Sequence, residues 1–190
     1  MKETPTIPCM AIIKIQNYRA KFGDQFFFDT NIWLLIYGPV ANYQKKDQKE
    51  YSKFLAEIIT RNYPIYITSM VISEFGNVIL RRDFRQWADN QVNNPSPDFK
   101  KDFIGTQDYI GSVQDIKQLI QDILALPIVT KIPDDFNNLD INSILNHFDL
   151  VDFNDSYISI LAEKKKYKIV TNDKDFQKLK DSVEIITTQV

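Results

Sequence analysis

Cysteine, histidine and glycine are all scarce in this sequence. Its 190 residues contain one cysteine, Cys9, and one histidine, His147. An internal disulfide, a cysteine-rich zinc site and a multi-histidine metal centre are therefore excluded. The five glycines are scattered and form neither a P-loop nor a dinucleotide-binding fingerprint. If the protein performs chemistry, we expect carboxylates to carry it.

Long hydrophobic runs are also missing. Residues 1–8 are polar and interrupted by prolines, and Lys14 interrupts the apolar stretch that follows. A secretion signal needs about 7–15 uninterrupted apolar residues and a membrane-spanning helix about 20. We therefore expect a cytoplasmic protein with no membrane contact. Lys and Arg number 23 against 25 Asp and Glu, a net charge of −2, so contact with a polyanion depends on local charge.

Short apolar runs alternate with helical patterns over most of the chain. Runs typical of buried strands lie at 26–28, 65–67, 127–129, 168–171 and 183–186, and a further short strand is possible at 11–15. Apolar residues recur at helical spacing over 32–37, 45–62, 69–87, 99–126, 141–148 and 154–166. This alternation predicts an α/β protein, a three-layer α/β/α sandwich around a mainly parallel sheet.

The same pattern suggests how the chain is divided. Residues 1–24 have weak periodicity and are interpreted as an N-terminal extension, and 25–190 as a single domain. Within that domain, residues from about 90 to 126 form a predicted helical insertion, with a loop over 90–98 and a kink near Gly105 or Gly111. Thr30 or Asn31 is the expected N-cap of the first helix.

Acidic residues stand where predicted strands end. Asp29 follows the first strand of the domain, Glu74 lies about one turn into the helix after the second, and Asp173 closes the strand at 168–171. Asp155 lies in the first turn of the helix that feeds that strand. Because right-handed crossovers bring the carboxyl ends of parallel strands to one rim, we expect these four side chains to converge.

Each acid also has a structural interpretation. Asp29 and Asp155 suit helix N-termini, as does Asp152, and Asp175 suits an ordinary turn. Taken singly, Asp152, Asp175 and Glu74 are better explained in this way. As a set the acids are harder to explain, because two carboxylates 4 Å apart repel by about 4 kcal/mol at an effective dielectric near 20.

Such a cluster is either partly protonated or holds cations. Hard oxygen ligands without thiolate select Mg²⁺ or Mn²⁺. A site of this kind lowers the pKa of bound water and supports displacement at phosphorus, which points to phosphodiester hydrolysis.

Four segments in order make the chain resemble a known family. They are Phe27-Phe28-Asp29-Thr30-Asn31-Ile32, residues 67–75, Asp152-Phe153-Asn154-Asp155-Ser156-Tyr157-Ile158 and residues 169–176. Together they resemble the PIN-domain ribonucleases, which include the VapC toxins of bacterial toxin–antitoxin pairs. The resemblance implies an α/β/α fold and a divalent-metal site of acidic residues, matched here by Asp29, Glu74, Asp155 and Asp173.

The resemblance also implies further roles. Neighbouring polar residues that orient the acids, and possible auxiliary acids, match Thr30, Asn31, Thr171, Asn172, Asp152 and Asp175. The implied activity is endonucleolytic cleavage of single-stranded RNA with Mg²⁺ or Mn²⁺, and the implied partners are an antitoxin protein and a second copy of the chain. The N-terminal extension and the long region over 90–126 exceed a compact toxin, which weakens the toxin interpretation but not the nuclease one.

Local basic charge lies next to the predicted acidic rim. Arg81, Arg82 and Arg85 follow Glu74 on the same predicted helix and are candidate phosphate contacts, although an acidic partner fits them equally well. Phe84 is assigned to packing, because aromatic residues at helical spacing are more often core.

Two alternatives to the nuclease remain. The chain could be a catalytically inactive PIN-like module that binds RNA or a protein. A phosphatase with an aspartyl nucleophile ranks low, because it requires a second Asp two residues after the first, where this chain has Asn31.

Overall fold

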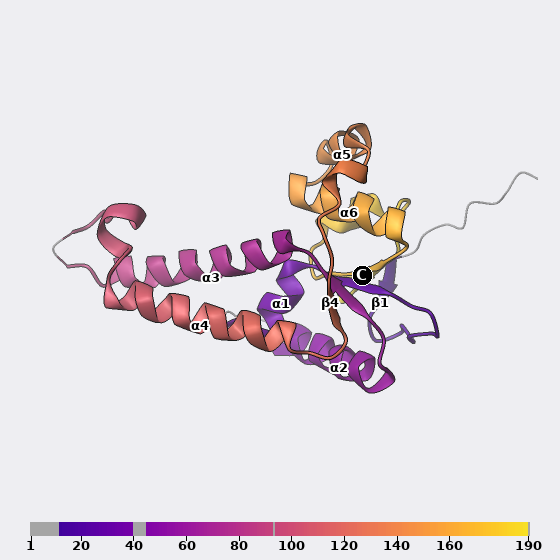
Figure 1. The fold of residues 1–190 in the computed structure, drawn as a ribbon, viewed down its shortest axis with the longest axis horizontal. Coiled ribbons are helices and arrows are strands. Elements are labelled where there is room, and N and C mark those ends of the chain that lie inside the picture. Colours follow the sequence, from indigo (N-terminus) through magenta and orange to yellow (C-terminus); the bar gives the residue numbers. More distant parts are fainter. Residues whose placement is uncertain (1–11, 40–44, 93, 190) are drawn as a thin grey trace, which may run out of the picture.

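The computed structural model describes residues 12–39, 45–92 and 94–189, and those residues contain a six-stranded sheet. The strand order is β1-β6-β5-β2-β3-β4, and every neighbouring pair is parallel (Figure 1). The strands are β1 (Ile12–Lys14), β2 (Phe26–Phe28), β3 (Ile65–Ile67), β4 (Val129–Lys131), β5 (Lys168–Val170) and β6 (Ile185–Thr187). The predicted parallel α/β fold is confirmed.

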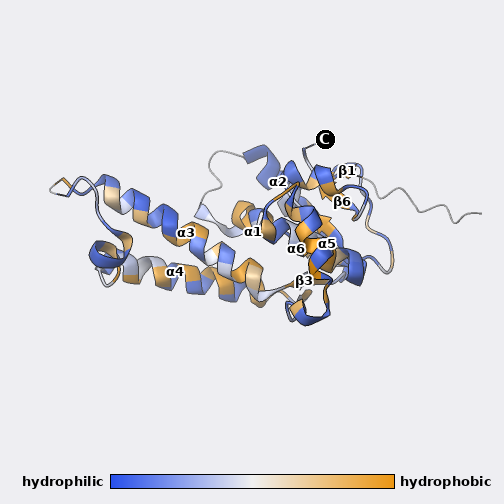
Figure 2. Cartoon of the chain, turned by 90° about the horizontal axis from the view of Figure 1, so that it is seen from above, coloured by the Kyte–Doolittle hydropathy of each residue, from blue (hydrophilic) through white to orange (hydrophobic). Residues whose placement is uncertain are grey.

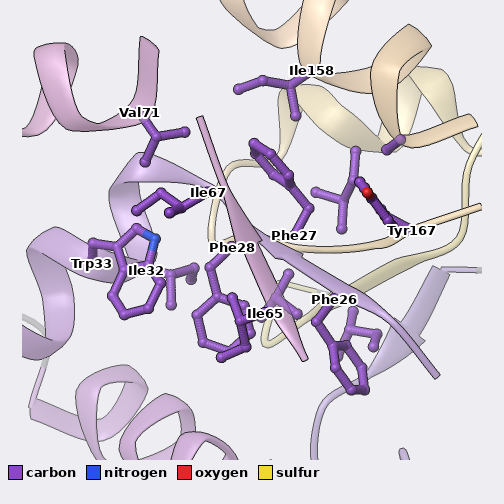
Figure 3. Close-up of a cluster of buried hydrophobic side chains, with 14 of the residues drawn as sticks. Phe26, Phe27, Phe28, Ile32, Trp33, Ile65, Ile67, Val71, Ile158 and Tyr167 are labelled. Carbon is purple, nitrogen blue, oxygen red and sulfur yellow. The ribbon is translucent and has the colours of Figure 1, made fainter. Parts of the chain in front are cut away.

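The strand β2 lies in the middle of the sheet and is completely buried. Phe28 packs against Trp33, with ring centroids 5.2 Å apart, and Phe26 packs against Phe54 at 5.6 Å. Phe27 points to the opposite face, toward Ile158 (Figure 3). A strand that is apolar on both faces requires a helical layer on each side, which explains its unbroken run of phenylalanines.

Helices form the two outer layers. On one face lie α1 (Thr30–Tyr37) and α2 (Lys45–Arg61), and on the other α5 (Ile141–Phe148) and α6 (Phe153–Lys165) (Figure 1). Shorter helical turns occur at Phe136–Asn138 and Asp175–Leu179. None of the helices in the described ranges combines the length and the apolar content that crossing a bilayer requires.

Two long helices leave the sheet as an arm. They are α3 (Ser69–Asp89) and α4 (Gln107–Leu124), which lie side by side and reach away from the strands (Figures 1 and 2). A π-helical turn (Phe99–Phe103) connects them, and Phe103 is completely buried at the tip. The break in the predicted insertion falls at Gly105, whose φ of +92° favours glycine, whereas Gly111 lies inside α4.

Some element boundaries differ from the prediction. β4 begins at Val129, two residues later than expected, because the amide of Val129 closes a turn onto the carbonyl of Leu126. β6 is likewise shifted to Ile185–Thr187. β1, within the segment assigned to an N-terminal extension, pairs with β6 as an edge strand. Residue 11, also in the predicted strand at 11–15, lies outside the described residues.

Candidate active site

Asp29 lies at the carboxyl end of β2 and begins α1. It is the N-cap of that helix, in place of Thr30 or Asn31, because its Oδ1 accepts the backbone N–H of Thr30 at 2.6 Å. Its Oδ2 accepts the hydroxyl of Thr171 at 2.8 Å and the side-chain amide of Asn31. The side chain is only 5% exposed. Asp29 is therefore held by donors from both β2–α1 and the segment after β5.

Glu74 reaches the same region from α3. Its Oε2 accepts the hydroxyl of Thr30 at 2.9 Å and the side-chain amide of Asn154 at 3.4 Å. Thr30 thus links the two acids, since its amide contacts Asp29 and its hydroxyl contacts Glu74. Asn154 is a site residue that the sequence did not single out, although its place between two acids was a usable signal.

Asp155 lies in the first turn of α6 and is 9% exposed. Asp152 is the N-cap of this helix, and its Oδ1 accepts the backbone N–H of Asp155 at 2.9 Å. Asp152 therefore has the capping role that its position indicates, and it fixes the backbone that carries Asp155.

Asp173 follows β5 in a turn held by polar contacts. Its amide donates to the hydroxyl of Thr171 at 3.0 Å, and its Oδ1 accepts the amide of Asp175 at 2.8 Å. Asp175 is exposed and forms an ion pair with Lys178 at 2.8 Å. The amide of Asn172 donates to Oδ1 of Asn31 at 3.0 Å, so this turn is tied to the start of α1.

The four acids influence one another electrostatically. The pKa of Asp29 is raised to about 7, chiefly by burial and also by the charges of Glu74 and Asp173, against the lowering effect of the Thr171 and Thr30 hydrogen bonds. The pKa of Asp155 is raised to about 8, chiefly by burial and also by repulsion from Asp29, Asp152, Asp173 and Glu74. The acids at these strand and helix ends are therefore close enough for their charges to repel one another.

The PIN domain family model matches residues 26–182 of this chain. The chain belongs to the PIN domain family. No curated protein matches it. Because the match spans all four segments that carry the acids, it places them in the part of the chain that defines a PIN domain. PIN domains are generally nucleases and generally use divalent metals.

Solved structures similar to this PIN domain include two at 14% sequence identity. One is VapBC2 from Rickettsia felis, crystallised with a DNA fragment from its promoter, with a TM-score of 0.49 over 86% of this chain and 98% of that one. The other is PAE2754 from Pyrobaculum aerophilum, with a TM-score of 0.47 over 86% of this chain and 83% of that one. Membership of the family rests on the match to the family model.

The acidic residues of this PIN domain have the donor chemistry that a hard divalent cation requires. The ion pairs within the described part of the chain involve other carboxylates, so Asp29 and Asp155 are buried without a cationic side chain beside them. A cation would relieve the repulsion that raises both pKa values. The chemical type of these side chains therefore suits a divalent metal ion.

The present orientations of these side chains do not bring three of them onto one point. Among residues 12–39, 45–92 and 94–189, no three His, Cys, Asp or Glu side chains are arranged so that they could hold a metal ion. The hydrogen bonds give the physical reason. Asp29, Glu74 and Asp173 each accept hydrogen bonds from different N–H or O–H donors, which turn their carboxylates in different directions.

The three candidate arginines separate in the structure. Arg82 contacts the neighbouring carboxylate of Asp83. Arg81 lines a hollow of about 360 Å³ beside Glu74, here called the rim hollow, which is formed by Met70, Ser73, Glu74, Asn77, Val78, Arg81 and Asn154. Arg85 lies one turn farther along α3 and lines a second hollow with Arg81. Two of the three arginines therefore face the surface that continues from the acids.

Proposed function

We propose that this PIN domain is a divalent-metal-dependent endoribonuclease that hydrolyses phosphodiester bonds of single-stranded RNA. The observation that carries the proposal is the pair of buried acids, Asp29 and Asp155, whose pKa values are raised to about 7 and about 8 within a group of four carboxylates. Burying so much like charge costs free energy, and capping two helices does not require it. A cation and a phosphate substrate account for it.

In this proposal Asp29, Asp155 and Asp173 would hold one or two Mg²⁺ or Mn²⁺ ions, with Glu74 bound directly or through water. When bound, such an ion supplies a water of lowered pKa and neutralises charge on the phosphate. The supporting residues position the acids: Thr171 and Asn31 hold the carboxylate of Asp29, and Thr30 and Asn154 hold that of Glu74. Asp152 fixes the helix turn that carries Asp155.

The experiment is digestion of a mixed RNA pool by the purified full chain, with Mg²⁺, with Mn²⁺ and with a chelator, followed by mapping of the cut sites. Cleavage that requires the metal and is lost in the Asp29→Asn variant supports the proposal. Asp181→Asn is the matched control, because Asp181 is also an aspartate but lies exposed after the Asp175–Leu179 turn. RNA that is bound but never cut with either metal would instead favour a catalytically inactive RNA-binding module.

We infer a cytoplasmic protein that acts as the toxin of a toxin–antitoxin pair, supported by the resemblance of its ordered acidic motifs to the VapC toxins. The same resemblance suggests a homodimer. Expression of the chain alone and together with the product of an adjacent small reading frame tests this: growth arrest that the neighbour relieves is expected, and normal growth in both cases contradicts it.

A further inference from the structure

One face of α3 runs from the acidic rim out along the arm. At 100° per residue, Glu74, Arg81 and Arg85 lie within about 40° of one another around the helix axis. The buried residues of the helix, Val71, Phe75 and Ile79, lie on the adjacent face, about 60–140° around the axis from Glu74. At 1.5 Å per residue, Arg81 and Arg85 lie about 10 and 16 Å along the axis from Glu74. The helix therefore places two cations in a line that starts at Glu74.

Two hollows follow this line. The rim hollow contains Glu74 and Asn154 at one end. The second, here called the arm hollow, has a volume of about 400 Å³ and is lined by Asn77, Leu80, Arg81, Phe84, Arg85 and Phe99. Asn77 and Arg81 line both, so the two hollows adjoin. A polymer that lies in the first can continue into the second.

The arm hollow is basic. Arg81 and Arg85 are exposed, and within the described ranges neither belongs to an ion pair, whereas Arg82 is paired with Asp83. No carboxylate is among the residues that line the arm hollow. The hollow thus combines positive charge with an absence of acidic groups, which is the opposite of the rim, and which favours a polyanion.

The arm hollow also has an aromatic wall. The rings of Phe84 and Phe99 lie 5.2 Å apart at 86°, and both side chains are half-buried. Behind them Phe103 is completely buried, 5.5 Å from Phe84 and 5.7 Å from Phe99. Phe84 does pack at the tip, as the sequence predicted, but it also lines the hollow. Rings held in this way form a fixed surface on which an unpaired base can stack.

We propose that the arm hollow is a subsite for an unpaired base of single-stranded RNA, in which the base stacks on the ring of Phe99, the perpendicular ring of Phe84 contacts its edge, and Arg81 and Arg85 contact the flanking phosphates. The inference rests on the proposed function, because it assigns to the arm the part of the substrate beyond the cleaved bond. A duplex does not fit the subsite, since its bases are stacked on one another and present no free face. Substrates long enough to reach the arm are therefore bound more tightly than short ones.

The test measures RNA binding without cleavage. A fluorescein-labelled, unstructured RNA of about 12 nucleotides is titrated with the full chain in a chelator, and the fluorescence anisotropy is followed over a range of salt concentrations. An RNA of about 4 nucleotides and the duplex form of the long one are the comparison probes. The variants are Arg81→Gln with Arg85→Gln, and Phe99→Leu. Lys117→Gln is the matched control, because it removes an exposed cation from α4 outside both hollows.

We expect the double arginine variant to bind the long RNA at least tenfold more weakly and its salt slope to fall by about 1.4, since each phosphate contact on a single strand contributes about 0.7. Phe99→Leu should weaken binding about five- to tenfold with an unchanged salt slope, which distinguishes stacking from charge. The Lys117→Gln variant should bind like the unmodified chain. The duplex should bind the unmodified chain more weakly than the single strand does.

Unchanged affinity of the double arginine variant for the long RNA overturns the inference. Because both arginine side chains are exposed, their replacement should not disturb folding, so this variant remains a valid test even if Phe99→Leu disturbs the arm tip. Equal affinity for duplex and single strand overturns it as well. The inference is also overturned if the variants still bind RNA but no longer bind a protein partner. If the variants lose RNA binding but no metal cleaves RNA, the proposed function fails and the subsite stands.

Discussion

Replacing Asp29 with Asn should change how the stability of the metal-free protein depends on pH. Burial and neighbouring acids raise the pKa of Asp29 from 3.8 to about 7 in the folded protein. As the pH rises above 4, the unfolded chain loses this proton while the folded protein keeps it, so the folded state binds more protons and stability falls with pH. The loss ends above pH 7, when both states are ionised.

The size of this effect follows from the shift. At 1.36 kcal/mol per pKa unit, a shift from 3.8 to about 7 corresponds to roughly 4 kcal/mol in total. About 3 kcal/mol of this falls between pH 5 and pH 8, where the folded group titrates. The Asp29→Asn variant has no titrating carboxyl at this position, so its free energy of unfolding does not fall with pH in this way. It also relieves Asp155 of one repelling charge, which acts in the same direction.

A second contribution does not depend on pH. Asp29 accepts hydrogen bonds from Thr30, Asn31 and Thr171, and an Asn side chain has only one acceptor oxygen. At least one buried donor is therefore left without a partner, which costs about 1–3 kcal/mol. The variant should be less stable than the unmodified protein at pH 5, and at pH 8 it should equal or exceed it by up to about 2 kcal/mol.

Urea unfolding followed by circular dichroism in a chelator, at pH 5 and pH 8, measures the two free energies of unfolding. The difference between variant and unmodified protein should increase by about 3 kcal/mol from pH 5 to pH 8. Asp181→Asn, the exposed control, should give a constant difference. A constant difference for Asp29→Asn as well would mean that Asp29 titrates normally, and it would remove the electrostatic basis of the proposed metal site.

Three further predictions concern the same site and the arm. Adding Mn²⁺ at pH 8 should stabilise the unmodified protein by about 2.7 kcal/mol at a hundredfold excess over Kd, and thereby raise its melting temperature. The melting temperature of Asp29→Asn should not change. Equal shifts in both proteins would place the ion elsewhere. Thr171→Val should lower stability at pH 8 by up to about 1 kcal/mol more than at pH 5 in urea unfolding, because it removes a donor to the Asp29 carboxylate and raises its pKa further. Phe103→Ala should abolish amide-exchange protection at the arm tip but not in β2, since Phe103 is the buried ring of the tip; simultaneous loss in both would show that the arm and the sheet unfold as one unit.

Local pattern was sufficient for the central strands and for the order of the acids. The Phe26–Phe28 run has no polar face, so it can only be a strand covered on both sides, and Asp29 must then stand at its carboxyl end. The same reasoning placed Asp173 at the end of β5. Asp152 was correctly interpreted as a helix cap, because capping depends on residues three positions apart along the chain.

Contacts between distant segments decided the rest. The hydrogen bond from Thr171 to Asp29 joins residues 142 positions apart, and that from Thr30 to Glu74 joins residues 44 apart. No local periodicity encodes such a pair. Three other features also depend on tertiary contacts. They are the pairing of β1 with β6, the projection of α3 and α4 from the sheet, and the separation of Arg82 from Arg81 and Arg85.

The sequence by itself therefore determined which carboxylates this PIN domain carries and at which edge of the sheet they gather. Only the tertiary structure decided which donors hold each carboxylate, how far burial raises the pKa values of Asp29 and Asp155, and where the basic surface lies relative to them. The physical reason is that strand and cap formation depend on near neighbours along the chain, whereas burial and Coulomb energy depend on distances that only the packed fold fixes.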